Sequence, residues 1–344
     1  MAIPEINVGG SPMCSLVAKG VGEDPIGSVA SFDRLLLIEV PLPWPRAVRT
    51  APRFPAAVDA ALTRADAAGI SFRLYGIVPD PAYTPVGLTR LISLQRPGRS
   101  MSVFHKTDFV VPHEVLGNLV QAVLEQSPAL AAFAEFRQDT THLRDVLVCT
   151  HGTRDRCCAS FGYPVYRRLR QASSLTGPRP SRAWRVSHIG GHRFAPTLID
   201  LPDGRCWAHM NDDALAKLMR QDGDLPDLAR HYRGWAALRG VPEMVAERAV
   251  FAERGWEWTT RTVTSEIIVP TDPITDRTEV RITFTEPDGR NPGCFDLTVE
   301  PTGVVTTGIG SCGDEDPSEH RQYHVTRMSR HDVCRPARPF ALAG

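Results

Sequence analysis

Short apolar runs alternate with amphipathic segments over the first two thirds of the chain, a pattern typical of α/β proteins. The run Leu35–Val40 has the character of a buried strand, and the Ala-rich stretch 55–69 has that of a helix that stops at Gly69. The same signals predict strands at Phe72–Val78, Leu88–Gln95 and Val103–Val111 and a helix at His113–Gln126. Residues 33–135 are therefore predicted to form one α/β unit.

A second series of the same kind follows. Its predicted elements are a strand at Asp145–Cys149, a helix over 158–173, a strand at Ala183–Val186, a hairpin of Leu198–Leu201 with Cys206–Met210, and a helix capped by Asn211 or Asp212. These elements define a second α/β unit over residues 136–222. The two units are interpreted as structural echoes of each other.

The flanking segments differ in pattern. Residues 1–32 are rich in Gly, Pro and Ser and are predicted to be a loop segment. Residues 223–344 are predicted to form a C-terminal α+β appendage. Its predicted elements are helices at Asp227–Leu238 and Pro242–Arg254, strands at Thr259–Val269, Thr278–Thr285 and Phe295–Glu300, and turns at Asp288-Gly289 and Thr302-Gly303.

The charge composition bears on whether the protein binds nucleic acid or a membrane. The 344 residues carry 39 Lys+Arg and 39 Asp+Glu, so no basic excess favours nucleic acid or an anionic membrane surface. The longest aliphatic run, Leu35–Ile38, is too short to span a membrane, and residues 1–30 have no apolar core of a signal peptide. We therefore expect a cytoplasmic protein, in which eight cysteines indicate metal binding, redox chemistry or burial rather than disulfides.

The candidate chemistry is concentrated after two predicted strands. Cys149 begins a stretch that reaches Cys157 and Cys158, and His188 and His192 enclose a Gly-Gly pair thirty residues later. Loops that follow the carboxyl ends of neighbouring parallel strands share one edge of a sheet, so the two stretches are expected to meet. Two thiolates and two imidazoles complete a four-ligand set for zinc or an iron–sulfur cluster.

The spacing of the cysteines favours an iron–sulfur cluster over a single zinc ion. In zinc sites with two cysteines and two histidines, the cysteines are usually two to four residues apart, whereas eight residues separate Cys149 from Cys158. That gap suits a [2Fe–2S] cluster. Two neutral imidazoles in place of two thiolates make such a cluster less negative, so its reduction potential should exceed that of an all-cysteine ferredoxin. A histidine ligand also couples that potential to pH.

Residues 149–169 and 184–204 resemble the sucrase/ferredoxin-like family, which belongs with the thioredoxin-like [2Fe–2S] ferredoxins. Residues 28–44 and 72–78 resemble it more weakly, and the likeness covers roughly residues 13–215. The resemblance implies that residues 136–222 are a thioredoxin-like ferredoxin domain and that residues 33–135 are a related unit. Nothing in the sequence resembles the two carboxylates of a glycosidase site, so sucrose hydrolysis is not expected.

Carried over from the family motif, the cluster ligands are Cys149, Cys158, His188 and His192. The second cysteine is ambiguous because Cys157 is adjacent to it, and the family pattern favours Cys158. The residues expected to surround the ligands are His151, Arg154, Asp155, Cys157, Gly190, Gly191 and Arg193. Arg154 and Asp155 are predicted either to form an ion pair that fixes the loop or to tune the cluster.

The sequence thus predicts an electron-transfer protein that exchanges electrons with an unidentified redox partner. An electron carrier is favoured over a stand-alone enzyme, with reductase activity left open, and no nucleotide-binding fingerprint is present. Two alternatives remain: a thioredoxin-like thiol–disulfide oxidoreductase that uses Cys157, Cys158 and Cys149, and a structural zinc module. Five cysteines have no partner at ligand spacing and are expected to be packing residues or isolated thiols: Cys14, Cys206, Cys294, Cys312 and Cys334.

Overall fold

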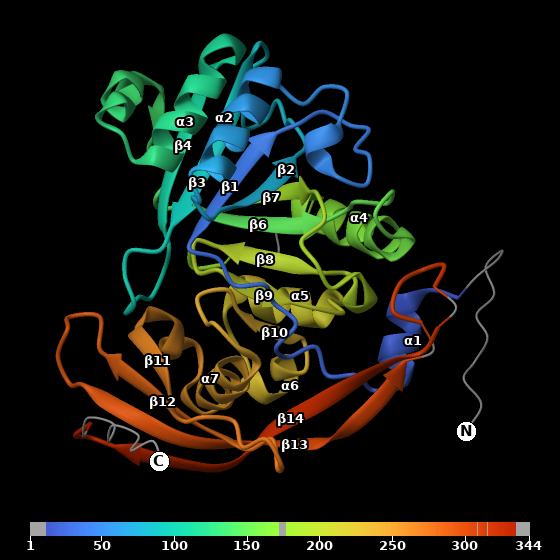
Figure 1. Ribbon diagram of the computed structural model, residues 1–344, viewed down its shortest axis with the longest axis vertical. Helices are drawn as coiled ribbons and strands as arrows, with labels where there is room; N and C mark the ends of the chain where they lie inside the picture. The colour runs from blue at the N-terminus through green and yellow to red at the C-terminus, as the bar shows by residue number, and fades with distance from the viewer. Residues whose placement is uncertain (1–11, 172–176, 308, 315, 335–344) are drawn as a thin grey trace.

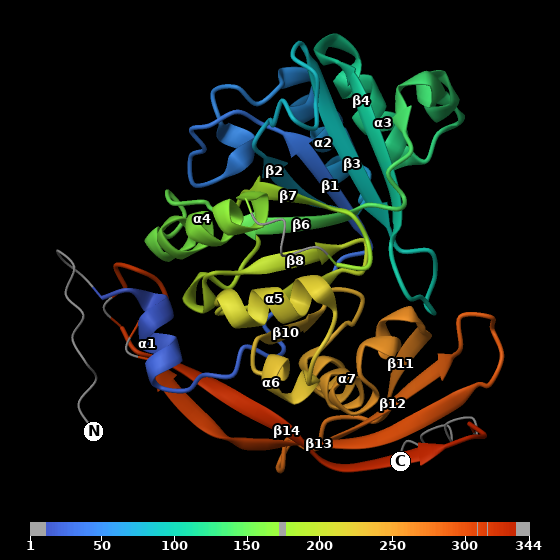
Figure 2. The same cartoon turned by 180° about the vertical axis from the view of Figure 1, so that it is seen from behind.

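The computed structural model describes residues 12–171, 177–307, 309–314 and 316–334. Its strands form a mixed sheet of ten strands and an antiparallel sheet of four. Helices α6 (Leu225–Ala229) and α7 (Val241–Arg254) lie between the two sheets in both views (Figure 1, Figure 2). The protein is therefore a mixed α/β structure with a second, smaller sheet. In the described part of the chain, no helix is both long and apolar enough to cross a membrane.

One half of the large sheet comes from the first predicted unit. Its elements are β1 (Arg34–Glu39), α2 (Ala56–Ala67), β2 (Arg73–Ile77), β3 (Leu88–Gln95), β4 (His105–Pro112), α3 (Leu116–Glu125) and the short β5 (Arg137–Gln138). β1 pairs in parallel with β2 and antiparallel with β3, and β4 lies beyond β3. The apolar residues of β1 are buried on both faces of the sheet, as expected for an inner strand.

The other half repeats this order. Its elements are β6 (Arg144–Cys149), α4 (Arg156–Gln171), β7 (Ser181–Val186), β8 (Leu198–Leu201), β9 (Arg205–Trp207), α5 (Asp212–Arg220) and the edge strand β10 (Tyr232–Trp235). The strand order β7-β6-β8-β9 matches β2-β1-β3-β4, and α4 connects parallel strands as α2 does. The side chain of Asn211 caps α5 by accepting a hydrogen bond from Ala214 N–H at 2.9 Å.

The halves join where β2 lies beside β7, through the pair Ile77 and Val186. One continuous sheet therefore runs through both predicted units, and the unit boundary near residue 136 stays a prediction. Cys149 ends β6 directly opposite Val186 at the end of the parallel strand β7. The residues that follow the two strands consequently emerge at the same edge of the sheet.

The smaller sheet is a meander that ends in a long hairpin. Its strands are β11 (Thr262–Val269), β12 (Thr278–Thr285), β13 (Gly293–Thr307) and β14 (Ser318–His331). Apolar side chains from β12 and β13 pack against α7 and join the core of the large sheet. The β13–β14 hairpin extends past this core, and its tip lies beside α1 (Cys14–Gly20) in Figure 1.

Helix α1 occupies part of the N-terminal segment for which the sequence predicts a loop. It has seven residues, too few for a periodic signal, and it buries Cys14, Ser15 and Ala18. Tertiary packing against residues 192–194 therefore stabilises it. Residues 1–11 of that segment, 172–173 at the end of a predicted helix and 335–344 of the predicted appendage lie outside the described residues.

Two predictions for the C-terminal part are wrong. The helix predicted over Asp227–Leu238 gives way to β10, which pairs with β9 and buries all four of its residues. Pairing with a sheet edge outweighs the helical spacing of that stretch. The turn predicted at Thr302-Gly303 is a bulge inside β13, where the pairing with β14 shifts between Pro301 and Gly303.

Candidate metal centre

Three of the four predicted ligands converge at the shared edge of β6 and β7. Cys149 is the last residue of β6, Cys158 lies in the first turn of α4, and His188 follows β7 by two residues. One ligand atom from each lies within 4.8 Å of the other two, and Cys158 Sγ is 3.9 Å from His188 Nδ1. Both thiols are buried, whereas the His188 ring is partly exposed. We call Cys149, Cys158 and His188 the first metal-binding group.

The two thiols of this group ionise as a pair. A hydrogen bond with Cys158 holds the pKa of Cys149 well below its usual range, and the same bond raises the pKa of Cys158. Ionisation of Cys149 is therefore favoured over ionisation of Cys158. A metal centre needs both thiolates, and its positive charge supplies the compensation that a second buried thiolate requires.

His192, the fourth predicted ligand, lies beside the group rather than within it. Its ring centroid is 5.6 Å from that of His188, and its Nδ1 is 3.3 Å from Asp155 Oδ2. Burial lowers the pKa of His192, which favours the neutral ring over the charged one. If the neutral ring carries its proton on Nδ1, the nitrogen nearer Asp155, the lone pair of Nε2 is available to a metal, in the carboxylate–histidine arrangement common among metal ligands.

His151 has no ring nitrogen left for a metal. Its Nδ1 accepts the backbone N–H of His188 at 3.0 Å, and its Nε2–H donates to the Pro45 carbonyl at 2.8 Å. Because one partner is only a donor and the other only an acceptor, the tautomer is fixed. Burial also lowers the pKa of His151, in keeping with a neutral ring. His151 thus holds the loop that carries His188.

The Gly-Gly pair between His188 and His192 makes a tight turn over a buried arginine. Gly190 and Gly191 have φ of +82° and +68°, where side chains other than glycine are strained. Beneath them, Arg233 donates to the Gly190 carbonyl at 3.2 Å and to Ser28 O at 2.7 Å. Sequence reasoning missed Arg233, because it lies on β10 more than forty residues beyond the motif.

The predicted ion pair between Arg154 and Asp155 does not form among the described residues. Asp155 Oδ1 instead accepts the Cys157 N–H at 2.8 Å, and Oδ2 accepts the Cys312 N–H at 2.9 Å. The carboxylate therefore binds backbone N–H groups in place of the arginine. Arg193, also expected near the site, forms a salt bridge of 2.8 Å with the buried Glu23.

Cys157 and Cys158 point into different environments. Cys158 belongs to the first group, whereas Cys157 Sγ lies 3.6 Å from Cys14 Sγ and 3.3 Å from Cys312 Sγ. We call Cys14, Asp155, Cys157 and Cys312 the second metal-binding group; their ligand atoms also lie within 4.8 Å of one another. Cys14 and Cys312, expected to lack partners, thus have partners from distant segments, which spacing along the chain cannot reveal.

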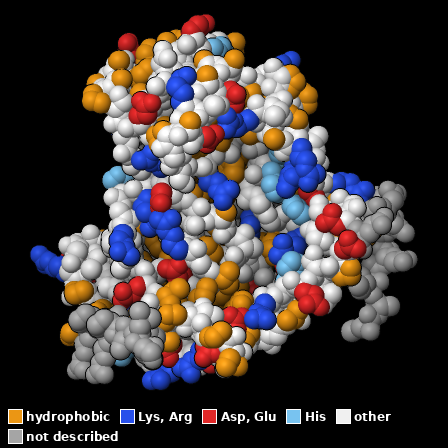
Figure 3. Space-filling view, viewed as in Figure 1, with side chains coloured by type: hydrophobic (Ala, Val, Ile, Leu, Met, Phe, Trp, Pro, Cys, Tyr) orange, Lys and Arg blue, Asp and Glu red, His pale blue; other side chains and the backbone are white. Residues whose placement is uncertain are grey.

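The imidazoles of the site face the surface. The side chain of His192 is 19% exposed, whereas the thiols of the first group are buried. Figure 3 shows histidine side chains on this face, between the positions of α4 and α1 and flanked by Lys or Arg side chains. The arrangement gives a buried thiolate side and a solvent-near imidazole side.

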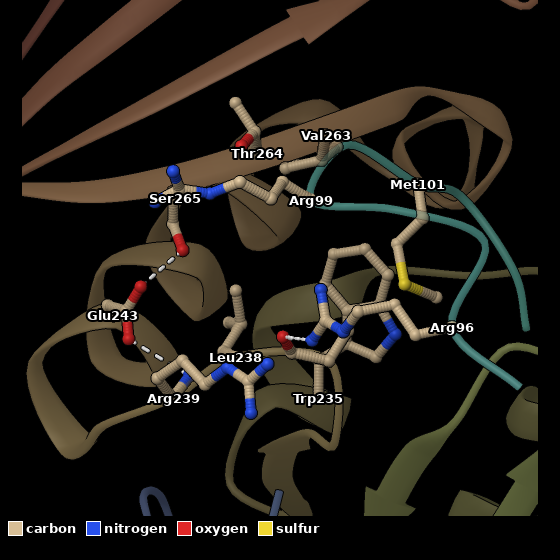
Figure 4. A pocket seen from close by; sticks show the side chains of 11 residues that line it. Arg96, Arg99, Met101, Trp235, Leu238, Arg239, Glu243, Val263, Thr264 and Ser265 are labelled. Atoms are coloured by element: carbon tan, nitrogen blue, oxygen red, sulfur yellow. Dashed lines mark hydrogen bonds between the residues drawn. The ribbon is translucent and has the colours of Figure 1, made fainter. Parts of the chain in front are cut away.

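A separate pocket lies where the large sheet meets β11 (Figure 4). It has a volume of about 110 Å³, and Arg96, Arg239 and Glu243 are among its lining residues. Arg96 and Arg239 both form salt bridges with Asp33, and Glu243 accepts the Arg239 N–H and the Ser265 hydroxyl. Arg96, Arg239 and Glu243 thus each have a charged or hydrogen-bonded partner, and no His or Cys lines the pocket, so the metal-binding groups remain the better candidate site.

Comparison with known families agrees with the motif. The sucrase/ferredoxin-like family model matches residues 25–234, which include every member of the first metal-binding group. Cys14 and Cys312 lie outside the matched range. Searches of curated proteins and of solved structures found no match. Because the matched range covers more than half of the described chain, the protein belongs to the sucrase/ferredoxin-like family.

Proposed function

We propose that this protein transfers electrons through one [2Fe–2S] cluster held by Cys149, Cys158, His188 and His192. The observation that carries the proposal is the convergence of two buried thiols and an imidazole at one sheet edge, from two loops thirty residues apart. The family membership supports it. When bound, such a cluster supplies a one-electron couple whose potential is raised by histidine ligation.

The donor set fits the proposed cluster. Soft thiolates and neutral imidazoles are its usual ligands, and the described first group holds no carboxylate that would favour a harder ion. Asp155 lies 3.3 Å from His192 Nδ1, and His151 fixes the backbone that leads into His188 by accepting its N–H. The protein thereby orients both rings before any metal is present.

Burial of the two thiols and exposure of the two imidazoles have different consequences. The thiol side excludes water, which protects the sulfurs from oxidation. The imidazole side is the entry and exit for electrons and the place where a proton can be exchanged with solvent. We therefore propose that a redox partner protein docks over His188 and His192.

The proposal also includes the domain assignment, the compartment and the classes of partner predicted from the sequence. Residues 136–222 are proposed to be the thioredoxin-like ferredoxin domain, and the protein is proposed to work in the cytoplasm without nucleic acid or membrane partners. The alternative of a thiol–disulfide oxidoreductase that uses Cys157, Cys158 and Cys149 is less well supported. Cys157 points into a different group from Cys158 and Cys149, so the adjacent cysteines do not form a reactive pair.

The test is the metal content of protein purified without oxygen. We expect about two iron atoms and two acid-labile sulfides per chain, with a rhombic paramagnetic signal after reduction. Cys158→Ser should lose both, whereas Cys206→Ser, which changes another buried thiol outside both groups, should keep both. Iron-free protein with zinc bound to the first group would contradict the proposal.

A further inference from the structure

Three thiols and a carboxylate meet outside the proposed cluster site. Cys14 comes from α1, Cys157 from the first turn of α4, and Cys312 from the tip of the β13–β14 hairpin. Their Sγ atoms lie 3.6 Å (Cys14 to Cys157), 3.3 Å (Cys157 to Cys312) and 3.7 Å (Cys312 to Cys14) apart. Asp155 completes the group, with its oxygens 3.6 and 3.7 Å from Cys14 Sγ. All three cysteines are free thiols.

These distances match the edges of a tetrahedral zinc site. Zn–S bonds of about 2.3 Å place two sulfurs about 3.8 Å apart, and a Zn–O bond of about 2.0 Å places oxygen and sulfur about 3.5 Å apart. The observed separations of 3.3–3.7 Å lie close to both values. They are far longer than the roughly 2.05 Å of a disulfide bond.

Two of the three sulfurs in the second group accept backbone N–H groups. Ser15 N–H donates to Cys157 Sγ at 3.4 Å, and Cys14 N–H donates to Cys312 Sγ at 3.5 Å. Cys157 also lies in the first turn of the 16-residue helix α4, where the helix dipole favours negative charge. Backbone N–H groups directed at sulfur are the outer contacts that metal thiolates require.

Asp155 is held in place as a ligand needs to be. The N–H groups of Cys157 and Cys312 and the Ser311 hydroxyl, at 3.0 Å, donate to its carboxylate. The side chain is buried together with Cys14 and Cys157, so water has little access to a bound ion. A closed set of four protein ligands is typical of structural rather than catalytic zinc.

We propose that Cys14, Cys157, Cys312 and Asp155 bind one structural zinc ion next to, and separate from, the [2Fe–2S] site. The thiolates select a borderline-soft divalent cation over calcium or magnesium. The ion links α1 and the β13–β14 hairpin to the start of α4, three segments that are distant in sequence. Its binding free energy therefore contributes to folding of this junction.

The two metal sites touch through one residue. His192 Nδ1 lies 3.3 Å from Asp155 Oδ2 and 3.7 Å from Cys14 Sγ, whereas its other ring nitrogen is the one assigned to iron. No cysteine belongs to both groups. Zinc and iron contents can therefore be changed separately by mutation.

The experiment measures zinc, iron and labile sulfide in the full chain, purified without oxygen from zinc-supplemented medium. We expect about one zinc per chain in addition to iron. Cys312→Ser and Cys157→Ser should reduce zinc to below about a tenth of that content and keep iron, since a structural site does not tolerate loss of a thiolate. Cys158→Ser should do the reverse, and Cys206→Ser should change neither metal.

X-ray absorption at the zinc edge of the unmutated protein gives a readout that does not depend on how a variant folds. Three sulfurs at about 2.3 Å and one oxygen or nitrogen at about 2.0 Å are expected. Zinc-free protein, a disulfide among Cys14, Cys157 and Cys312 in the intact mass, or loss of iron in Cys312→Ser would each overturn the proposal. Protein with zinc in this coordination but no iron would refute the proposed function and leave the zinc site standing.

Discussion

Gly191→Ala tests whether packing against Arg233 supports the turn between His188 and His192. Gly191 has φ of +68°, and an added Cβ would lie 2.6 Å from Arg233 Cζ and 3.1 Å from its Nε. Arg233 is 1% exposed and is held by Ser28 and the Gly190 carbonyl, so the guanidinium has no room to withdraw without breaking hydrogen bonds. The substitution therefore strains the backbone and displaces a buried charge together.

The two effects differ in size. A left-handed conformation costs a residue with a side chain about 1 to 2 kcal/mol. Loss of one hydrogen bond to a charged group adds about 1.5 to 3 kcal/mol. The free energy of unfolding should therefore fall by about 2.5 to 5 kcal/mol. Gly69→Ala is the matched control, because Gly69 has φ of +69° with no atom within 4 Å of an added Cβ, and it should lose only about 1 to 2 kcal/mol.

Urea unfolding followed by tryptophan fluorescence measures both losses, and iron analysis of the same samples measures the site. Gly191→Ala should also reduce iron content, because the turn carries both His188 and His192, whereas Gly69→Ala should not. Equal destabilisation by the two substitutions would refute the inference that Arg233 packing supports this turn. Full iron content in Gly191→Ala would show that the turn can deform without moving the ligands.

Two further predictions follow from the histidines. His188→Cys should keep a cluster but lower its reduction potential and weaken the pH dependence of that potential, as redox titration at several pH values would show; an unchanged pH profile would remove His188 from the ligand set. His151→Phe should keep iron but lower the free energy of unfolding by about 2 to 4 kcal/mol at pH 8, since His188 N–H and the Pro45 carbonyl lose their partners. Burial lowers the pKa of folded His151, so its stabilisation is complete above the unfolded value of 6.5 and is lost as the pH falls below it. Denaturation at pH 8 and pH 5 should therefore show a smaller difference between wild type and His151→Phe at the lower pH, and a constant difference would contradict this account.

Much of the large sheet is predictable because its strands carry their own signals. The buried run of β1 and the asparagine cap of α5 are local features, and the structure has both where the sequence places them. β10 and α1 are different, because pairing with β9 forms the first and packing against residues 192–194 forms the second. Neither partner is visible from the sequence of the element itself.

The same distinction applies to the site. Cys149, Cys158 and His188 are recognisable because they lie at or shortly after the ends of two strands that are parallel neighbours. Asp155 has an obvious partner in the adjacent Arg154, yet its bonds go to backbone N–H groups of Cys157 and Cys312. The contact between Asp155 and Cys312 joins residues more than 150 positions apart. It depends on how the β13–β14 hairpin packs, which the spacing of residues along the chain does not reveal.

The pair Cys157 and Cys158 shows why the sequence left the second cysteine ligand ambiguous. Consecutive residues of a helix point about 100° apart, so two adjacent thiols in its first turn cannot serve one small metal centre equally. In the structure, Cys158 points to Cys149 and His188, whereas Cys157 points to Cys14 and Cys312. A motif search has to choose one cysteine and treat the other as a neighbour. If both proposals hold, each cysteine is a ligand, and α4 is the element that fixes the distance between the two metals.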